Sequence, residues 1–171
     1  MKQYLIAIIT VLLTSSLGLK AQQDTVKREK YLYLSAGAPT IYAGMSYEHQ
    51  MYQFKNISIL PRVGFGMNIF KPSFGKEYNF HTGITTLTGN QKHKLEVGIG
   101  LIHYLMQQYN FENDKNTIIY KPIIYSLLGY RYDMINKPIS LKIAFAPIIA
   151  LNKDNNTFFP LIDIGIGMKI K

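Results

Sequence analysis

The four histidines, His49, His81, His93 and His103, are the side chains best suited to acid–base or metal chemistry. No two of them stand two or four residues apart, so none forms a pair with the spacing of metal ligands. The sequence has no Gly-x-Ser-x-Gly motif and no glycine-rich phosphate loop. It also has no cysteine, which excludes disulfides and thiolate metal sites. We therefore predict no catalytic, cofactor-binding or metal-binding residues.

The charged residues that interrupt alternating apolar segments share a common placement, which the four histidines as a group do not. A strand places successive side chains on opposite faces, so a charge between two large apolar residues lies on the face opposite to theirs. This rule places three acids, three bases and one histidine on a shared inner face: Glu48, Glu96 and Asp163, Arg62, Arg131 and Lys142, and His81. Charges in a narrow, poorly hydrated interior are costly, so we expect these groups to form a paired inward polar network.

The segment from Ile162 to Ile170 shows the pattern most clearly. Every even position is a large apolar residue, and every odd position from Asp163 to Lys169 is a charge or a glycine. The segment therefore has one entirely apolar face and one polar or bare face. An apolar outer face with a polar inner face is typical of a strand in a transmembrane β-barrel.

The same alternation divides the rest of the chain into eight predicted strands. They are residues 30–38, 40–50, 56–70, 77–89, 94–109, 118–132, 138–151 and 158–171. The inner face carries mainly glycines and single charges, which suits the narrow interior of an eight-stranded barrel. A soluble barrel, the alternative, needs a charged exterior and an apolar interior. We predict an all-β fold, an eight-stranded antiparallel up-and-down transmembrane β-barrel.

The N-terminus predicts export. Lys2 precedes an apolar run over residues 4–13, and Ala21 marks the expected cleavage site of a signal peptide spanning residues 1–21. The run is shorter than the ~20 residues that a spanning helix needs, which disfavours the alternative of an uncleaved anchor. Residues 22–29 are polar and are predicted to be a periplasmic lead-in to a barrel over residues 30–171.

Export also limits the partners of a basic chain. Removal of residues 1–21 takes away Lys2 and Lys20, so 17 basic and 10 acidic residues remain, a formal charge of +7. An exported protein is not expected to bind nucleic acid. Membrane lipid and lipopolysaccharide phosphates are the expected counter-charge, and a plainer interpretation is that the lysines lie in solvated turns.

An even number of strands places both ends of the barrel on one side, which the signal peptide makes the periplasm. Connections 51–55, 90–93 and 133–137 are then periplasmic turns, and 39, 71–76, 110–117 and 152–157 are cell-surface loops. Pro122, Pro147 and Pro160 fall towards the surface ends of the last three strands, where the missing N–H predicts a bulged or loosened rim.

Aromatic residues gather near the predicted strand ends, as expected for two girdles at the membrane interfaces. They are Tyr31, Tyr33, Phe70, Tyr78, Phe80, Tyr104, Tyr109, Tyr120, Tyr130, Tyr132, Phe158 and Phe159.

Short motifs recur along the chain in a characteristic order. They are Tyr47-Glu48, the segment from Lys92 to Gly100, Leu128-Gly129-Tyr130-Arg131-Tyr132, Phe145-Ala146-Pro147, Phe158-Phe159-Pro160 and Gly165-Ile166-Gly167. With these motifs the chain resembles the small outer-membrane β-barrel proteins common in Bacteroidota. Such proteins often end on an aromatic residue, and this sequence ends Lys169-Ile170-Lys171. The resemblance implies a fold and a location in the outer membrane, and no activity.

Two classes of function remain open. The first is a monomeric, non-enzymatic barrel with a structural, envelope-integrity or surface-interaction role, inserted by the barrel-assembly machinery and plugged by its inward polar network. The second is a lipid A-modifying enzyme, a deacylase or acyltransferase, which would need a serine, a histidine and an acid together. His81-Thr82-Gly83 lacks the serine that a deacylase has two residues after its histidine. A small pore is a further alternative, disfavoured because eight strands leave little bore. We predict the first class.

Overall fold

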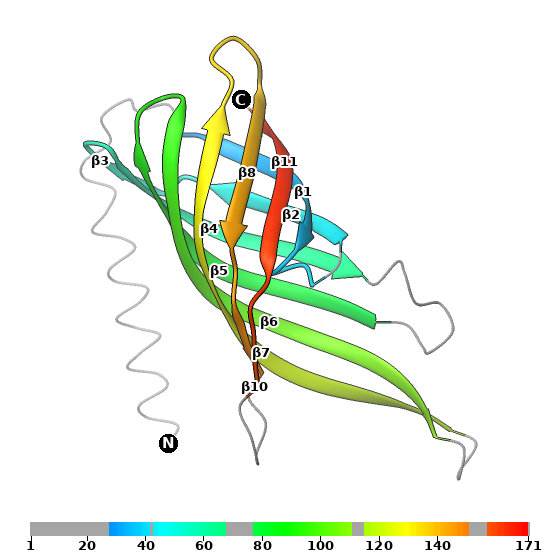
Figure 1. The fold of residues 1–171 in the computed structure, drawn as a ribbon. Coiled ribbons are helices and arrows are strands. Elements are labelled where there is room, and N and C mark those ends of the chain that lie inside the picture. The colour runs from blue at the N-terminus through cyan, green and yellow to red at the C-terminus, as the bar shows by residue number, and fades with distance from the viewer. Residues whose placement is uncertain (1–27, 42, 68–76, 111–114, 151–156, 171) are drawn as a thin grey trace, which may run out of the picture.

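The computed structural model describes residues 28–41, 43–67, 77–110, 115–150 and 157–170, which form a closed antiparallel β-barrel (Figure 1). The strands are β1 (Lys30–Gly37), β2 (Ala43–His49), β3 (Tyr52–Phe54), β4 (Ile57–Met67), β5 (Glu77–Gly89), β6 (His93–Asn110), β7 (Lys115–Asp133), β8 (Ile139–Phe145), β9 (Ile148–Ala150), β10 (Thr157–Phe159) and β11 (Ile162–Ile170). The predicted signal peptide, most of the lead-in and the predicted loop 71–76 lie outside the described residues. The predicted loops 110–117 and 152–157 lie outside them in part, and their described ends, Asn110, residues 115–117 and Thr157, belong to β6, β7 and β10.

Closure of the barrel is complete because β11 pairs with β8 on one side and with β1 on the other. β3 continues β2, β9 continues β8, and β10 precedes β11 in the same row of the wall, so the wall has eight strand positions. The predicted eight-stranded antiparallel barrel is confirmed.

Side-chain alternation sets the two faces of the wall. In β11, Ile164 is 59% exposed on the outside and Asp163 is fully buried inside. Strand β6 shows the same contrast, with Ile99 62% exposed on the outside and Glu96 1% exposed on the inside. The outer face is therefore apolar and the inner face polar, which is the reverse of a soluble barrel.

The part of the chain that the structure describes contains no helix long and apolar enough to cross a membrane.

The two ends of the barrel differ in their connections. We call the end with the short turns at residues 55–56, 90–92 and 134–138 the turn end, and the opposite end, with residues 38–41, the loop end. The predicted turn 51–55 is shorter than expected because β3 pairs with β4 as far as Phe54. Four steps from Glu48 to Tyr52 are matched by three steps from Arg62 to Ile59, so the chain bulges by one residue. The predicted strand 40–50 ends where its alternation stops. The alternation stops there because of this bulge, which the sequence does not reveal, and the strand pairing resumes in β3.

The connection after β1 is longer than the predicted single residue 39, and it folds into the barrel mouth. Gly37 has a φ of 104°, and a Cβ there would lie 1.7 Å from the carbonyl oxygen of Ile162, so this position requires glycine. Ala38 and Thr40 are fully buried. Asn79 Nδ2 donates a hydrogen bond to the Thr40 carbonyl at 2.5 Å. The turn thus covers the interior at the loop end.

The prolines behave in two ways. Pro147 and Pro160 interrupt the ladder, separating β8 from β9 and β10 from β11. The predicted bulged or loosened rim is confirmed at these two prolines as an interrupted ladder, and the register is unchanged across both breaks. Pro122 lies inside continuous β7, opposite His103, and the expected break is wrong there. Its other neighbour, β9, pairs with β7 only from Ile123 onwards, so the missing N–H disrupts no described bond on that side.

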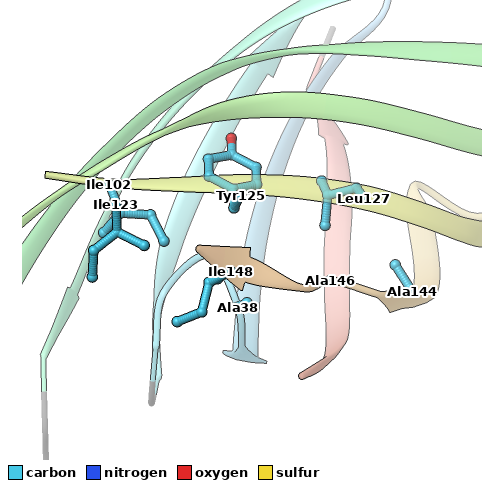
Figure 2. Packing of buried hydrophobic residues seen from close by; sticks show 8 residues of the cluster. All are labelled: Ala38, Ile102, Ile123, Tyr125, Leu127, Ala144, Ala146 and Ile148. Carbon is cyan, nitrogen blue, oxygen red and sulfur yellow. The ribbon is translucent and has the colours of Figure 1, made fainter. Parts of the chain in front are cut away.

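Buried apolar side chains form two groups inside the barrel. The apolar cluster lies at the loop end and comprises Ala38, Ile102, Ile123, Tyr125, Leu127, Ala144, Ala146 and Ile148 (Figure 2). A smaller group comprises Tyr31, Tyr33, Leu60 and Leu87. Tyr31 and Tyr33 were predicted to lie in an interfacial girdle and are instead fully buried, because odd-numbered residues of β1 point inward. Tyr104 likewise packs against the apolar cluster.

Candidate functional site

The barrel interior collects the predicted polar residues. All seven are at most 4% exposed, and each comes from a different strand: Glu48 (β2), Arg62 (β4), His81 (β5), Glu96 (β6), Arg131 (β7), Lys142 (β8) and Asp163 (β11). Each faces inward because its sequence neighbours lie on the outer face of the wall, as strand alternation requires. Six of the seven take part in ion pairs, and His81 does not.

Four of these residues form a closed ring of ion pairs. The Nε of Arg62 donates to Oε1 of Glu48 at 2.7 Å, and its Nη2 donates to Oε1 of Glu96 at 2.5 Å. The Nη2 of Arg131 donates to Oε2 of Glu48 at 2.8 Å and to Oε2 of Glu96 at 2.9 Å. Each guanidinium therefore bridges both carboxylates, so no member of the ring is buried without a partner of opposite charge.

Lys142 and Asp163 form a separate pair, with Nζ 2.8 Å from Oδ2. The Lys142 ammonium lies 4.8 Å from the ring centroid of Tyr33, and the Arg131 guanidinium carbon lies 4.9 Å from the same centroid. The Tyr33 hydroxyl is hydrogen-bonded to the Ser140 hydroxyl. One buried tyrosine ring thus supports two buried cations through its negative face.

His81 lies close to this network without joining it. Neither ring nitrogen has a hydrogen-bond partner among the described residues, and the ring meets Tyr125 edge-on at a centroid distance of 6.3 Å. A nucleophilic relay needs a serine on one ring nitrogen and an acid on the other. The surroundings of His81 do not supply that arrangement.

Inward glycines make room for the large inward side chains. Gly64 stands directly across from His81, Gly165 from Lys142, and Gly167 from Tyr33. A Cβ on Gly64 would lie 2.3 Å from the His81 ring, and one on Gly167 would lie 2.4 Å from the Tyr33 ring. Glycines of the inner face therefore stand opposite its large charged and aromatic residues. A narrow barrel has no room for two large inward side chains in one cross-strand pair.

A second charge cluster, which the sequence analysis did not identify, lies at the turn end. Lys94 Nζ lies 2.8 Å from Glu29 and 2.9 Å from Asp133, and Lys169 Nζ lies 2.9 Å from each of the same two carboxylates. Lys94 and Lys169 have the inward parity of Glu96 and Asp163, which was a usable signal. Glu29 and Asp133 had been placed in the lead-in and in a turn.

Glu29 precedes β1 and anchors the start of the barrel. Burial raises the pKa of this carboxyl, but hydrogen bonds from Lys169, Lys94 and Tyr31 outweigh burial and hold the pKa at about 2. Its backbone N–H also donates to Oε1 of Gln50 at 3.0 Å. Glu29 is therefore ionised at neutral pH and ties the chain to the inside of the wall.

The interior is layered along the barrel. Inward residues of β7 run from Asp133 at the turn end through Arg131 to Leu127 and Tyr125 towards the loop end. The second charge cluster contains two acids and two bases, and the predicted set contains three acids and three bases. Both layers are formally neutral, so neither has an excess charge that would attract ions of one sign.

The other three histidines lie away from the interior, each beside a tyrosine. His103 Nδ1 is 2.7 Å from the Tyr120 hydroxyl, and the His93 ring is hydrogen-bonded to the Tyr130 hydroxyl. His49 stacks on Tyr47. All three pairs lie on the apolar outer wall, and those of His49 and His93 lie at strand ends, the position expected for interfacial rings. Within the described ranges, no three His, Asp or Glu side chains are grouped so that they could hold a metal ion.

Comparison of the sequence with protein-family models and with curated proteins finds no match. The structure is similar to the N-terminal β-barrel domain of Pseudomonas aeruginosa OprF, with a TM-score of 0.57 and 12% identity, covering 84% of this chain and 96% of that domain. It is also similar to the Yersinia pestis outer membrane protein Ail, with a TM-score of 0.51 and 10% identity, covering 84% of this chain and all of that one. At these identities the likeness shows the fold.

Proposed function

We propose that this chain is an integral outer-membrane β-barrel protein with a non-enzymatic structural, envelope-integrity or surface-interaction role and a plugged lumen. The observation that carries the proposal is the inverted distribution of side chains. Large apolar residues are exposed all round the outer wall, and charged residues are buried inside it. Such a surface is unstable in water and suited to hydrocarbon. The predicted signal peptide and the resemblance to small barrels of Bacteroidota support the same location.

Three layers of side chains along the barrel support the proposed plug. The turn end is closed by the second charge cluster, the middle by the ring of ion pairs, and the loop end by the apolar cluster under residues 38–41. The charged side chains of the polar layers form ion pairs, and the apolar layer is closely packed. A conducting path would have to break all three, so the small-pore alternative is disfavoured.

The enzymatic alternative has no support from the described geometry. His81 lacks the serine and acid partners of a relay, and the other histidines are hydrogen-bonded or stacked with outward tyrosines. The partners proposed for the chain are membrane lipid and lipopolysaccharide on its outer wall and the barrel-assembly machinery during insertion. We propose no nucleic acid partner and a monomeric barrel.

Three measurements test the proposal. The full-length chain, expressed in a Gram-negative host and fractionated, should be recovered with outer-membrane markers; recovery in the soluble periplasmic fraction would overturn the location. The purified barrel in planar lipid bilayers should give no discrete conductance steps, and steps that scale with protein would overturn the plug. An unchanged lipid A acyl pattern in a deletion strain, measured by mass spectrometry, is the outcome expected for a non-enzymatic role.

A further inference from the structure

An apolar groove of about 620 Å³ crosses the outer wall between β8 and β4. Its floor includes Ala36 of β1 and Ala43 of β2, which are direct cross-strand partners. Its sides include Met45, Phe65 and Ile164, which are 44–59% exposed. The groove exists because two alanines face each other where neighbouring outward pairs carry large side chains, so the wall is indented there.

The lining limits what can occupy the groove. No charged side chain lines it, and its one hydroxyl, on Ser35, is buried with the inward parity of β1. The backbone at the floor is already paired, since β1 bonds to both β2 and β11 and β2 bonds to β4. A peptide or a headgroup would find no hydrogen-bond partner there. The groove therefore suits a purely apolar, flexible and narrow occupant.

The position of the groove selects among apolar occupants. Ala36 and Ala43 lie next to the turn at residues 38–41, so the groove opens towards the loop end and is continuous with the lipid-facing wall. The wall of a second barrel is convex and cannot reach the floor of a groove. An empty groove would forfeit dispersion contacts along its lining, and the flexible thioethers of Met45 and Met67 can adapt to a chain.

We propose that this groove binds one acyl chain of a lipid in the surface-side leaflet, and this inference rests on the proposed membrane location. Association between apolar groups inside a bilayer depends on fit and contact area and not on exclusion of water. The alanine floor supplies that fit. The lipid held there would be retained when most of the bilayer is replaced by detergent.

The absence of tryptophan from the sequence allows a direct test. Phe65→Trp places a reporter in the groove wall, and Phe80→Trp places one on its direct cross-strand partner, which is equally outward and does not line the groove. Each variant, folded in detergent micelles, is titrated with phosphatidylcholine brominated on its acyl chains. Phe65→Trp should be quenched saturably at one lipid per barrel and should resist dilution with further micelles. Phe80→Trp should be quenched several-fold less at that ratio, and dilution should reverse it.

Filling the groove supplies the matched control. Ala43→Leu in the Phe65→Trp background should abolish the saturable quenching, and Ser126→Leu, which adds the same side chain to the outer wall of β7, should leave it intact. Equal quenching of the Phe65→Trp and Phe80→Trp reporters in micelles would overturn the groove as a lipid site. Absence of quenching in Phe65→Trp, together with a dimer trapped by chemical cross-linking, would also overturn it, because a second copy would then cover the groove. In brominated phosphatidylcholine vesicles both reporters should be quenched; if neither is, the membrane location itself fails.

Discussion

The barrel interior has a charged half and an apolar half, which are lined by side chains of opposite chemistry. In the charged half, five acids and five bases form charge-balanced ion pairs between the turn end and the level of Gly37. Four of these ten residues make up the ring of Glu48, Arg62, Glu96 and Arg131. Towards the loop end, Ile102, Tyr125 and Ile148 pack with alanines under the 38–41 turn. The charged half depends on every partner being present, because a single deletion leaves a buried charge. The apolar half depends on volume, because its contacts are non-directional.

The largest effect is expected in the charged half. Arg131→Met leaves Glu48 and Glu96 each with one cationic partner fewer, and the free energy of unfolding should fall by about 3–5 kcal/mol. Unfolding in urea, followed by the loss of compact electrophoretic mobility, measures the change. Lys121→Met, at an exposed position of the same strand far from the ring, should change stability by less than about 0.5 kcal/mol. Equal stabilities of the two variants would contradict the ring's role.

A cavity in the apolar half should lower the free energy of unfolding slightly less than Arg131→Met does. Ile102→Ala removes a fully buried side chain from the apolar cluster and should destabilise the barrel by about 2–5 kcal/mol. Ile99→Ala, on the outer face of the same strand, should cost less because lipid or detergent fills the space. A larger loss for Ile99→Ala would show that the outer wall, and not the cluster, holds this end together.

The glycines that separate large inward side chains test the packing of the narrow interior. A Cβ at Gly100 would lie 2.2 Å from the Thr82 carbonyl oxygen and 2.6 Å from the Tyr125 ring. Gly100→Ala should therefore destabilise the barrel by about 1–3 kcal/mol. Gly98→Ala, two residues away on the same face, meets its nearest atom at 3.2 Å and should be tolerated better. Similar unfolding midpoints for the two variants would contradict this account.

The smallest effect concerns pH at the turn end. The pKa of Glu29 is lowered from 4.5 to about 2, so its contribution to stability is present above pH 4.5 and is lost as pH falls towards 2. Glu29→Gln should be less stable than the parent chain at neutral pH, and the difference should shrink across that window. Unfolding midpoints measured at several pH values check this, and a difference that grew on acidification would have the wrong sign.

Sequence reasoning succeeded where one strand sufficed. The alternation around Asp163 and Glu96 predicted which side chains face inward, because that choice depends only on neighbours along the chain. It failed where a residue-type preference was put before the parity of the strand, and where two strands had to be compared. Tyr31 and Tyr33 were assigned to a girdle because aromatics are common at both places, although the parity of Leu32 and Leu34 pointed them inward. The bulge between β2 and β3 depends on register against β4, which no local pattern contains.

The sequence by itself determined the eight strands, the outward apolar face and the identities of the inward charges. Each of these follows from the alternation of apolar with polar or small residues along a single segment. Only the tertiary structure decided which inward residues meet. That Arg62 lies between Glu48 and Glu96, that Gly64 stands across from His81, and that Glu29 reaches Lys169 all follow from the register between strands. Register is set when the wall closes on itself, since strand number and stagger together fix which positions share a level.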